Sequence, residues 1–551
     1  MGGEAKRYLY CDHMGSVTFG SGETTMHMFA ARLALSVSAA LLALCMILTS
    51  EPAAAQAVAP AASGAPANEQ IIITNVPRHS SRVREFLKRL FGRASAAKAK
   101  LEVTGSEVWT VPKGKLAGVE KRLKRLGSKV IRLRENWNHI LRRSKEPVAM
   151  TAAQRAAVNK MSKSPETVNL GMFSMPDPAL VELALNGELK TQEQFARVII
   201  PVSDDESVTI VRTRPTDKTD KGFTWSGEVE GTGERAVLML WRDGHLSGYF
   251  GHKGRVFTVN HVRGQVHTMA EIDPGRLPAD HAPTLQRRSL KRLNGEGKEL
   301  SQLPSVPPEP TVAPFPTAER RALEAKKVTI NLMLLYTKNA ASHYVRDPGD
   351  LLALAVEQAN DSFRNSGLVN ISLRLVHAQE IDYNEASAQQ FEHLYRMVDG
   401  VGPFRDVKKL RYEKRADIVG LIVDDPTGCG LSTRVGADAQ EAYFVVHHAC
   451  AAITYSIAHE VGHILGARHD RVVDANTMPF AFGHGYINGT KWRDMMSYQE
   501  GCGGCPRIPY WSNPRIKYRG EPTGTAASDN ARVILQEAER VSRYRDQLVQ
   551  W

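Results

Sequence analysis

Hydrophobic residues are spaced in three different ways along the chain, and each spacing predicts a different kind of structure. Between residues 71 and 145, the apolar run 108–111 is typical of a strand, and 129–133 of a second one. Between them, apolar residues recur at helical spacing, at Leu116, Val119, Leu123 and Leu126. We predict a small basic α/β unit of the βαβ type here.

From about residue 165 to 282, short apolar runs alternate with glycine-rich turns, which predicts a β-rich unit. Strands are expected at 195–201, 208–212, 236–241, 246–251 and 255–259. Residues 283–327 are polar and rich in proline, which is typical of an extended, protease-accessible linker.

From residue 328 to 551, strand-like and helix-like segments alternate, and this order predicts an α/β domain. Strands are expected at 328–336, 369–376, 416–423 and 442–446. Helices are expected at 348–366, 386–398, 454–465 and 529–547.

Near the N-terminus, the sequence is typical of a secretory signal peptide over residues 26–57. Arg32 precedes the apolar run 33–48, and a small-residue cleavage site follows. The run is shorter than the about 20 residues that span a membrane. We therefore predict a secreted, extracellular protein with no stable membrane anchor, which passes through the periplasm if the host is bacterial; an uncleaved anchor is the alternative. Residues 1–25 are interpreted as a dispensable leader.

The 551 residues are enough for several domains, and their net charge is +12. Such a charge can indicate binding to nucleic acid or to an anionic surface. Here the lysines and arginines of the 71–145 unit lack an accompanying aromatic-rich motif. We interpret them as a solvated basic face and expect no nucleic-acid partner.

Four cysteines lie near the C-terminus, and an even number in an exported chain predicts two disulfides. Cys502 and Cys505 form a CxxC pair, which could also be a redox or half-zinc motif. Without a second CxxC or a thioredoxin-like context we favour a structural bridge, which leaves Cys429 to pair with Cys450. Sequence alone permits three connectivities.

The strongest chemical signal is the segment 459–470. His459 and His463 are four residues apart, so a helix presents both imidazoles on one face, as a Zn²⁺ site requires. Gly466 permits a sharp turn that would bring His469 round as a third ligand. Glu460 lies beside the first ligand, in position to contact a water rather than the metal. We predict a catalytic zinc site with one open position.

A second element follows downstream. HExxHxxGxxH followed by a Met-turn is the metzincin signature, and Met496 with Tyr498 fits that turn best, with Met495 as the alternative. The HExxH part alone is a modest signal, but the full pattern fixes six residue types within twelve positions. Three other histidines are interpreted as structural: His447, His448 and His484.

From about residue 328 onward, the chain resembles the bacterial reprolysin-like metzincins, in particular peptidyl-Asp metalloendopeptidases. The resemblance rests on Leu334-Leu335-Tyr336-Thr337, Gly428-Cys429-Gly430, the zinc motif ending in His469-Asp470, Phe482-Gly483-His484-Gly485-Tyr486, Met496-Ser497-Tyr498 and Tyr510-Trp511-Ser512-Asn513-Pro514.

This resemblance implies a five-stranded mixed sheet with an active-site helix and a small C-terminal subdomain, with zinc between them. Substrate would pair with an edge strand, for which we choose 442–446. Asp470 would brace the Met-turn. Tyr498 stands where animal reprolysins usually carry proline, and we expect it to pack rather than to catalyse. Cleavage before Asp would require a cation in the specificity pocket; Arg507 is a candidate, but we interpret it as a surface arginine.

Together these features predict a zinc endopeptidase that acts on protein or peptide substrates, with Glu460 as general base. Residues 58–282 would be a propeptide that inhibits the enzyme or assists its folding, removed by cleavage near 320–327. The chain has no cysteine between 46 and 428, so a carboxylate, a histidine or steric cover must provide latency. The alternatives are a non-catalytic binding module and a zinc hydrolase of non-peptide bonds. Calcium binding is left open.

Overall fold

The computed structural model describes residues 68–74, 83, 85–87, 89, 99–133, 137–144, 148–185, 197–214, 217–218, 221–280, 309–346, 348–386 and 388–547. The expected leader, the signal peptide and residues 283–308 of the expected linker lie outside them. Among the described residues, no helix is long and apolar enough to cross a membrane.

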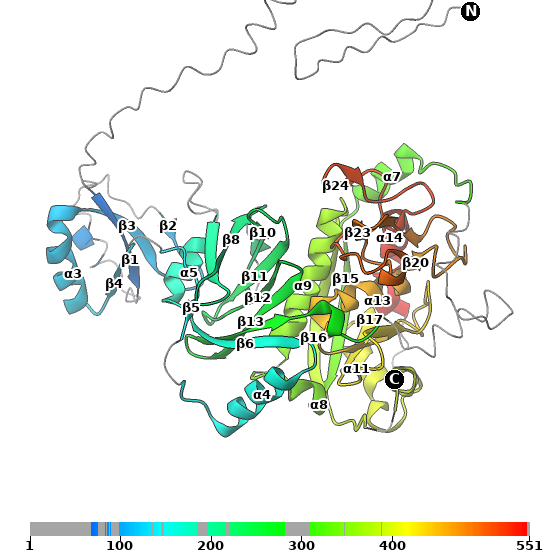
Figure 1. Cartoon of the computed structure of the whole chain (residues 1–551), viewed down its shortest axis with the longest axis horizontal. Coiled ribbons are helices and arrows are strands. Elements are labelled where there is room, and N and C mark those ends of the chain that lie inside the picture. Colours follow the sequence, from blue (N-terminus) through cyan, green and yellow to red (C-terminus); the bar gives the residue numbers. More distant parts are fainter. Residues whose placement is uncertain are drawn as a thin grey trace, which may run out of the picture. The chain divides into compact units, whose positions relative to one another are not determined.

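The N-terminal α/β unit is a four-stranded sheet against which helix α3 packs (Figure 1). Its strand order is β2-β3-β1-β4, with bounds Ala99–Lys100, Glu107–Pro112, Asn68–Thr74 and Lys129–Arg132. Helix α3 (Leu116–Arg125) connects β3 to β4, as the periodicity predicts. The predicted strand-helix-strand order is present, and two strands that were not predicted complete the sheet. Strand β1 lies between β3 and β4 and is antiparallel to both, and β2 pairs with the other side of β3.

The β-rich unit is one antiparallel sheet of order β5-β6-β14-β13-β12-β11-β10-β8-β7, and β9 pairs with β10. In chain order its strands are Arg142–Arg143, Thr167–Ser174, Arg197–Pro201, Ser207–Arg212, Asp217–Lys218, Gly222–Val229, Arg235–Trp241, Leu246–His252, Arg255–Arg263 and Val266–Ile272. The sequence analysis named none of strands β5, β6, β9, β10 and β14, nor helices α4 (Ala152–Lys163) and α5 (Pro178–Leu185).

The C-terminal domain is built on a five-stranded mixed sheet, as expected. Its order is β16-β15-β17-β19-β18, with bounds Ile371–Ile381, Val328–Thr337, Ile418–Val423, Tyr443–His447 and Gly430–Ser432. The first four strands are parallel, and β18 is antiparallel to β19. We expected the edge strand at 442–446, but this segment, β19, is internal. The edge on this side of the sheet is formed by β18. The sequence analysis did not predict this strand, because three residues are too few to show the alternation of a strand pattern.

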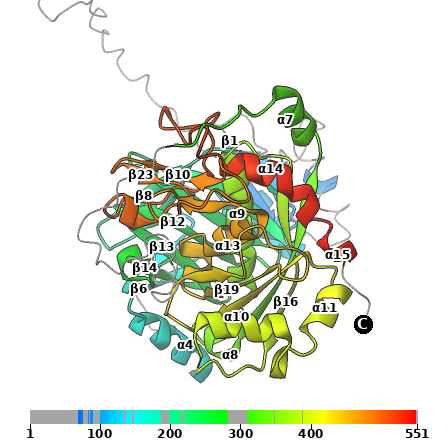
Figure 2. The ribbon, with the colours of Figure 1, turned by 90° about the vertical axis from the view of Figure 1, so that its right-hand side faces the viewer.

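Both faces of this sheet are covered, which explains why β15 is an almost continuous apolar run. Leu332 and Leu334 pack with helices α9 (Gly349–Asn365) and α13 (Ser456–Leu465). Met333 and Leu335 point the other way and pack with α10 (Gln390–Asp399) and α11 (Val407–Glu413). Figure 2 shows α13 and α10 over the sheet. Shorter helices are α8 (Lys338–Ala341) and α12 (Cys450–Ile453).

Beyond α13 the chain forms small two-stranded sheets and closing helices. The sheets pair β20 (Arg468–Asp470) with β21 (His484–Gly485), β22 (Ile487–Asn488) with β23 (Trp492–Arg493), and β24 (Lys517–Tyr518) with β25 (Glu521–Pro522). Helices α14 (Asn530–Val541) and α15 (Tyr544–Gln547) follow, within the segment where one closing helix was predicted.

The end of the expected linker is not extended. Residues 317–324 form helix α7 (Thr317–Glu324), which packs near α14. Gln536 donates a hydrogen bond to Glu319 (2.8 Å), and Asn370 donates one to the carbonyl of Lys326 (2.7 Å). Of the two basic pairs near the expected cleavage site, Arg320-Arg321 lies on this docked helix and Lys326-Lys327 follows it directly, so cleavage within the helix would require local unfolding.

The β-rich unit packs directly on the C-terminal domain. Val237 and Tyr249, from β11 and β12, belong to the same hydrophobic core as α9 and α13. The guanidinium of Arg235 lies 3.1 Å from the carboxylate of Asp361 on α9, and that carboxylate is buried. An apolar core with a buried ion pair at its margin holds the two parts together, so residues 221–280 reach the C-terminal domain in a fixed geometry.

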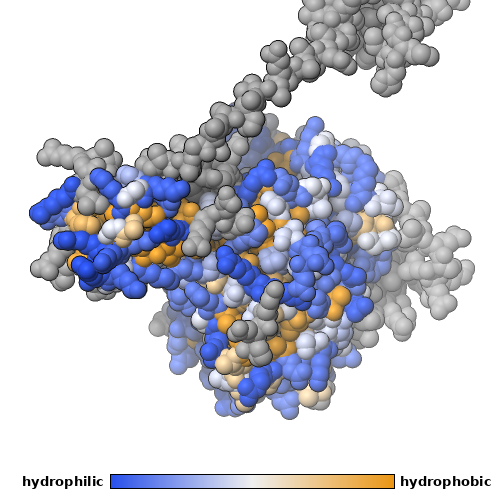
Figure 3. Space-filling model, turned by 60° about the vertical axis from the view of Figure 1, so that its left-hand side comes forward, coloured by the Kyte–Doolittle hydropathy of each residue, from blue (hydrophilic) through white to orange (hydrophobic). Residues whose placement is uncertain are grey.

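The surface of the chain is mainly polar. In Figure 3, hydrophilic residues cover much of the face shown, with hydrophobic residues in smaller patches between them. On α3, Lys121, Arg122, Lys124 and Arg125 are all exposed, while Leu116, Val119 and Leu123 are buried.

Leu334 provides a test of the sheet core. It is fully buried against α9 and α13, so Leu334→Ala should leave a cavity and lower the free energy of unfolding by about 2–5 kcal/mol. Val369 is 76% exposed, and Val369→Ala should change stability by at most about 0.5 kcal/mol. Urea denaturation of the full chain measures both, and equal midpoints for the two variants would contradict this packing.

Candidate metal centre

Three histidines converge at the C-terminal end of helix α13. The Nε2 atom of His469 lies 3.2 Å from Nε2 of His459 and 2.9 Å from Nε2 of His463. These are the three ligand candidates of the sequence motif, and their ligand atoms lie within one cluster. The side chains of His459 and His463 are almost fully buried.

Local backbone geometry explains the convergence. His459 and His463 are one helical turn apart on α13, so their rings project from the same face. The helix ends at Gly466, whose φ of +109° lies in the left-handed region, where a Cβ would be strained. That turn reverses the chain into β20, which carries His469 back to the helix.

Main-chain carbonyls orient the helical ligands. Nδ1 of His459 donates to the carbonyl of Met495 (3.0 Å), and Nδ1 of His463 donates to the carbonyl of Ala467 (2.9 Å). These bonds place the proton on Nδ1, so that Nε2 offers its lone pair toward the cluster. Neutral imidazoles with their lone pairs directed at one point repel one another unless a cation lies between them. The donor set therefore fits a divalent metal such as zinc, for which nitrogen ligands are well suited.

Glu460 lies on the same helix and is buried. Ser432 Oγ, on edge strand β18, donates a hydrogen bond to its carboxylate (2.6 Å). A Cβ at Gly430 would lie only 2.5 Å from Glu460 Oε1, so a larger residue at this position of the edge strand would displace the carboxylate. Burial raises the pKa of Glu460 to about 8; the bond from Ser432 opposes the shift, and the nearby charge of Asp280 adds to it. Sequence reasoning did not single out Ser432.

The Met-turn lies beneath the helix. Met496 is fully buried, and its sulfur lies close enough to helix residue Gly462 that a Cβ there would be 3.1 Å away. Asp470 accepts a hydrogen bond from the backbone N–H of Tyr498 (2.9 Å), which links the third histidine's strand to this turn. The ring of Tyr498 packs against that of His469, with 4.2 Å between the centroids.

A second buried carboxylate, Asp494, supports the turn and was not foreseen. It accepts hydrogen bonds from Ser497 Oγ (2.5 Å) and from the backbone N–H of Ser512 (2.9 Å). Burial raises its pKa to about 7. Its position directly before Met495 could have indicated a role in the Met-turn, but the sequence alone does not show that this aspartate is buried.

Arg507 is not the surface residue that we expected. Its side chain is 7% exposed, and its guanidinium lies 2.8 Å from the carboxylate of Asp280. It also donates hydrogen bonds to the carbonyls of Thr454 (3.0 Å) and Ser497 (3.2 Å). The partner belongs to the end of the β-rich unit, so only the tertiary fold could reveal the pair.

Both disulfides favoured in the sequence analysis are present. Cys429 is bonded to Cys450, and Cys502 to Cys505. The first joins the segment before β18 to α12, and the second closes a tight loop shortly after the Met-turn.

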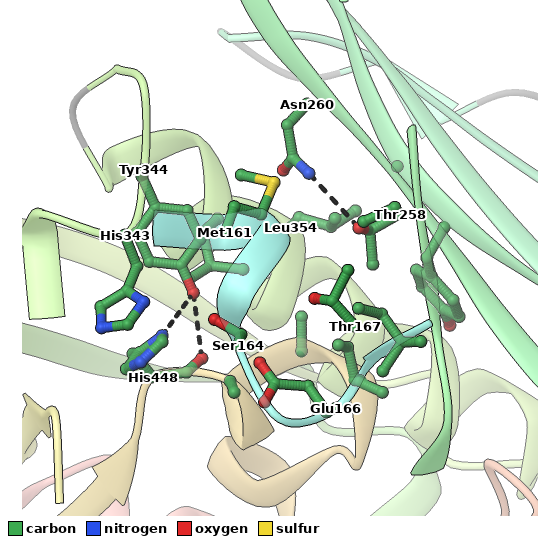
Figure 4. A pocket seen from close by; sticks show the side chains of 18 residues that line it. Met161, Ser164, Glu166, Thr167, Thr258, Asn260, His343, Tyr344, Leu354 and His448 are labelled. Carbon is green, nitrogen blue, oxygen red and sulfur yellow. Dashed lines mark hydrogen bonds between the residues drawn. The ribbon is translucent and has the colours of Figure 1, made fainter. Parts of the chain in front are cut away.

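A second His/Asp cluster lies away from this centre, beside a pocket of about 60 Å³ lined by residues from both parts of the chain. His343 Nε2 lies 2.9 Å from a carboxylate oxygen of Asp424, and His448 Nε2 lies 3.4 Å from the other. Figure 4 shows Tyr344 bonding His448 at this wall. Lys160 of α4 already places its ammonium 3.4 Å from Asp424, which neutralises the carboxylate. His484, which the sequence analysis interpreted as structural, is buried, and its Nδ1 donates a hydrogen bond to the carbonyl of His469.

Comparisons with known proteins identify a metallo-peptidase domain in the part of the chain that contains these histidines. Residues 326–512 match the model of metallo-peptidase family M12, of the reprolysin type. The peptidyl-Asp metalloendopeptidase of Stenotrophomonas maltophilia is 28% identical over 428 residues, 73% of this chain and 93% of that protein. The protein of the same name from Xanthomonas campestris pv. campestris is 28% identical over 406 residues, 72% of this chain and 91% of its own. That from Pseudomonas fragi is 42% identical over 99 residues, 17% of this chain and 62% of its own. Residues 326–512 thus form a metallo-peptidase domain of the reprolysin type, and the chain is a metalloendopeptidase.

Proposed function

We propose that the chain is a secreted zinc endopeptidase, made as an inactive precursor, that cleaves proteins on the N-terminal side of aspartate. The observation that carries the proposal is the convergence of three imidazole Nε2 atoms beside the buried carboxylate of Glu460. The ligands would be His459, His463 and His469. Bound zinc would act as a Lewis acid that polarises the scissile carbonyl and lowers the pKa of water.

In this proposal, Glu460 is the general base and later the general acid. It would take a proton from the attacking water and deliver it to the leaving amine nitrogen. The hydrogen bond from Ser432 fixes the carboxylate relative to edge strand β18. A substrate that pairs with this strand would therefore meet Glu460 at a set distance.

The supporting residues have structural roles in this scheme. Gly466 lets His469 return to the helix, and Met496 packs beneath the ligands. Asp470 holds Tyr498 through the backbone, and the ring of Tyr498 fixes the plane of His469. We assign Tyr498 to packing rather than to catalysis.

Secretion and latency complete the proposal. A signal peptide at 26–57 would direct export, consistent with the two disulfides of the C-terminal domain. Residues 58–282 would be the propeptide, and the protease domain would begin at 328. The preference for aspartate is supported by the names of the bacterial relatives, which are called peptidyl-Asp metalloendopeptidases.

Removal of the metal should abolish activity. The protein, produced as the full-length precursor and then matured, should cleave casein. The chelator 1,10-phenanthroline should stop cleavage and added Zn²⁺ should restore it, because no other group of the site would polarise the scissile carbonyl. Mass mapping of the products should place most cuts before Asp. Chelator-resistant cleavage would contradict a metal mechanism, and cuts without regard to Asp would limit the proposal to a general endopeptidase.

Glu460→Gln should separate metal binding from turnover. The amide cannot accept a proton from water, so casein hydrolysis should fall by at least about 100-fold. Zinc content, measured by mass spectrometry of the metal, should stay at one ion per chain. Glu380→Gln, at an exposed carboxylate on β16, is the matched control and should keep full activity. A Glu460→Gln variant with near-normal turnover would exclude this residue as the base.

A further inference from the structure

We propose that the guanidinium of Arg507 binds the acidic side chain of the substrate, and that in the precursor the carboxylate of Asp280 occupies the binding site of that side chain. Residues 279–280 would then be a built-in, substrate-like inhibitor. The inference rests on the proposed function for its meaning, but its evidence is a separate set of contacts between the end of the β-rich unit and the metal centre.

Arg507 lies between the two elements that form the metal centre. It donates to the carbonyl of Thr454, just before helix α13, and to that of Ser497, between Met496 and Tyr498. These bonds hold the guanidinium against the Met-turn without neutralising its charge. A buried cation is costly unless an anion pairs with it. In the described structure that anion is Asp280.

The guanidinium is also able to receive a carboxylate from a substrate. Nη2 bonds Asp280, while the neighbouring Nε is buried and has no hydrogen-bond partner among the described residues. A carboxylate placed side-on would accept from both nitrogens, the geometry in which arginine recognises carboxylates most strongly. An asparagine amide could not pair in this way and would leave the buried charge uncompensated. This difference would select Asp over Asn.

Main-chain bonds hold the segment 279–280 against the active-site edge. The backbone N–H of Cys429 donates to the carbonyl of Ala279 (2.7 Å), and that of Gly430 donates to the carbonyl of Asp280 (3.3 Å). Gly430 begins β18, the edge strand, and packs directly on the carboxylate of Glu460. The segment therefore occupies the strand edge where a substrate would add, as peptides commonly do at exposed sheet edges.

The same contacts explain why this segment inhibits. A peptidase that cleaves before aspartate would attack the carbonyl of Ala279, the residue before Asp280. In this structure that carbonyl accepts a hydrogen bond from the backbone N–H of Cys429, the residue directly before edge strand β18. Asp280 occupies the binding site for the substrate's acidic side chain, while hydrogen bonds hold the peptide bond between Ala279 and Asp280 in place. A carboxylate is one of the three sources of latency that remain for a propeptide without cysteine.

Binding of short peptides tests the proposal without relying on catalysis. All variants are full-length, zinc-loaded and carry Glu460→Gln to prevent self-cleavage. The probes are fluorescein-labelled Ala-Ala-Ala-Asp-Ala-Ala and its Asn counterpart, followed by fluorescence anisotropy. Asp280→Asn should bind the Asp peptide at least about tenfold more tightly than the chain with Asp280 intact, because the peptide no longer competes with an internal carboxylate. The matched control is Asp273→Asn, which removes a carboxylate that pairs with Arg255 and Arg276 within the β-rich unit. It should leave affinity unchanged.

Adding Arg507→Met to the Asp280→Asn chain should abolish the preference for the Asp peptide over the Asn peptide. Arg507→Lys keeps the charge without the two-nitrogen geometry and should retain part of it, which guards against a Met variant that misfolds. Unchanged affinity after Asp280→Asn, or an Asp preference that survives both substitutions at Arg507, would overturn the inference. The expected binding pattern in a chain that fails to cleave casein would support the inference while removing the proposed catalysis.

Discussion

The end of helix α13 is the constraint on which the metal centre depends. Two imidazoles one turn apart on a helix supply two nitrogen ligands on the same side. A third nitrogen must come from a residue outside the helix. Gly466 makes this possible, because its left-handed backbone reverses the chain within a few residues. The turn also places the carbonyl of Ala467 where it orients His463. One backbone conformation thus fixes both the position of His469 and the tautomer of His463.

Buried polar groups then hold the surroundings of the histidines in place. Asp470 and Asp494 bond backbone and hydroxyl groups of the Met-turn, and Ser432 bonds Glu460. Each carboxylate is buried, and burial raises its pKa. Such groups are costly to bury and are retained where their hydrogen bonds position neighbouring atoms. The centre is therefore organised by a polar framework rather than by apolar packing alone.

The β-rich unit places one of its residues, Asp280, beside the metal centre in a fixed position. Its sheet shares an apolar core with α9 and α13, and the Arg235–Asp361 ion pair lies at the contact. The chain leaves β14 and reaches Asp280 eight residues later, beside Arg507. Because the sheet is anchored, the carboxylate is delivered to one place. If residues 279–280 inhibit the metal centre as proposed, this packing would hold them in place, and separation of the two parts would withdraw them.

The sequence determined the features that depend on local spacing. The helical spacing of His459 and His463, the turn at Gly466 and the apolar run of β15 all follow from residues within a few positions of one another. Strand order, the edge position of β18 and the burial of Asp494 depend on partners far along the chain, so no local pattern encodes them. Arg507 is the clearest case. Its sequence surroundings are those of a surface arginine, and it becomes a buried cation only because the fold brings Asp280 from a distance of 227 residues.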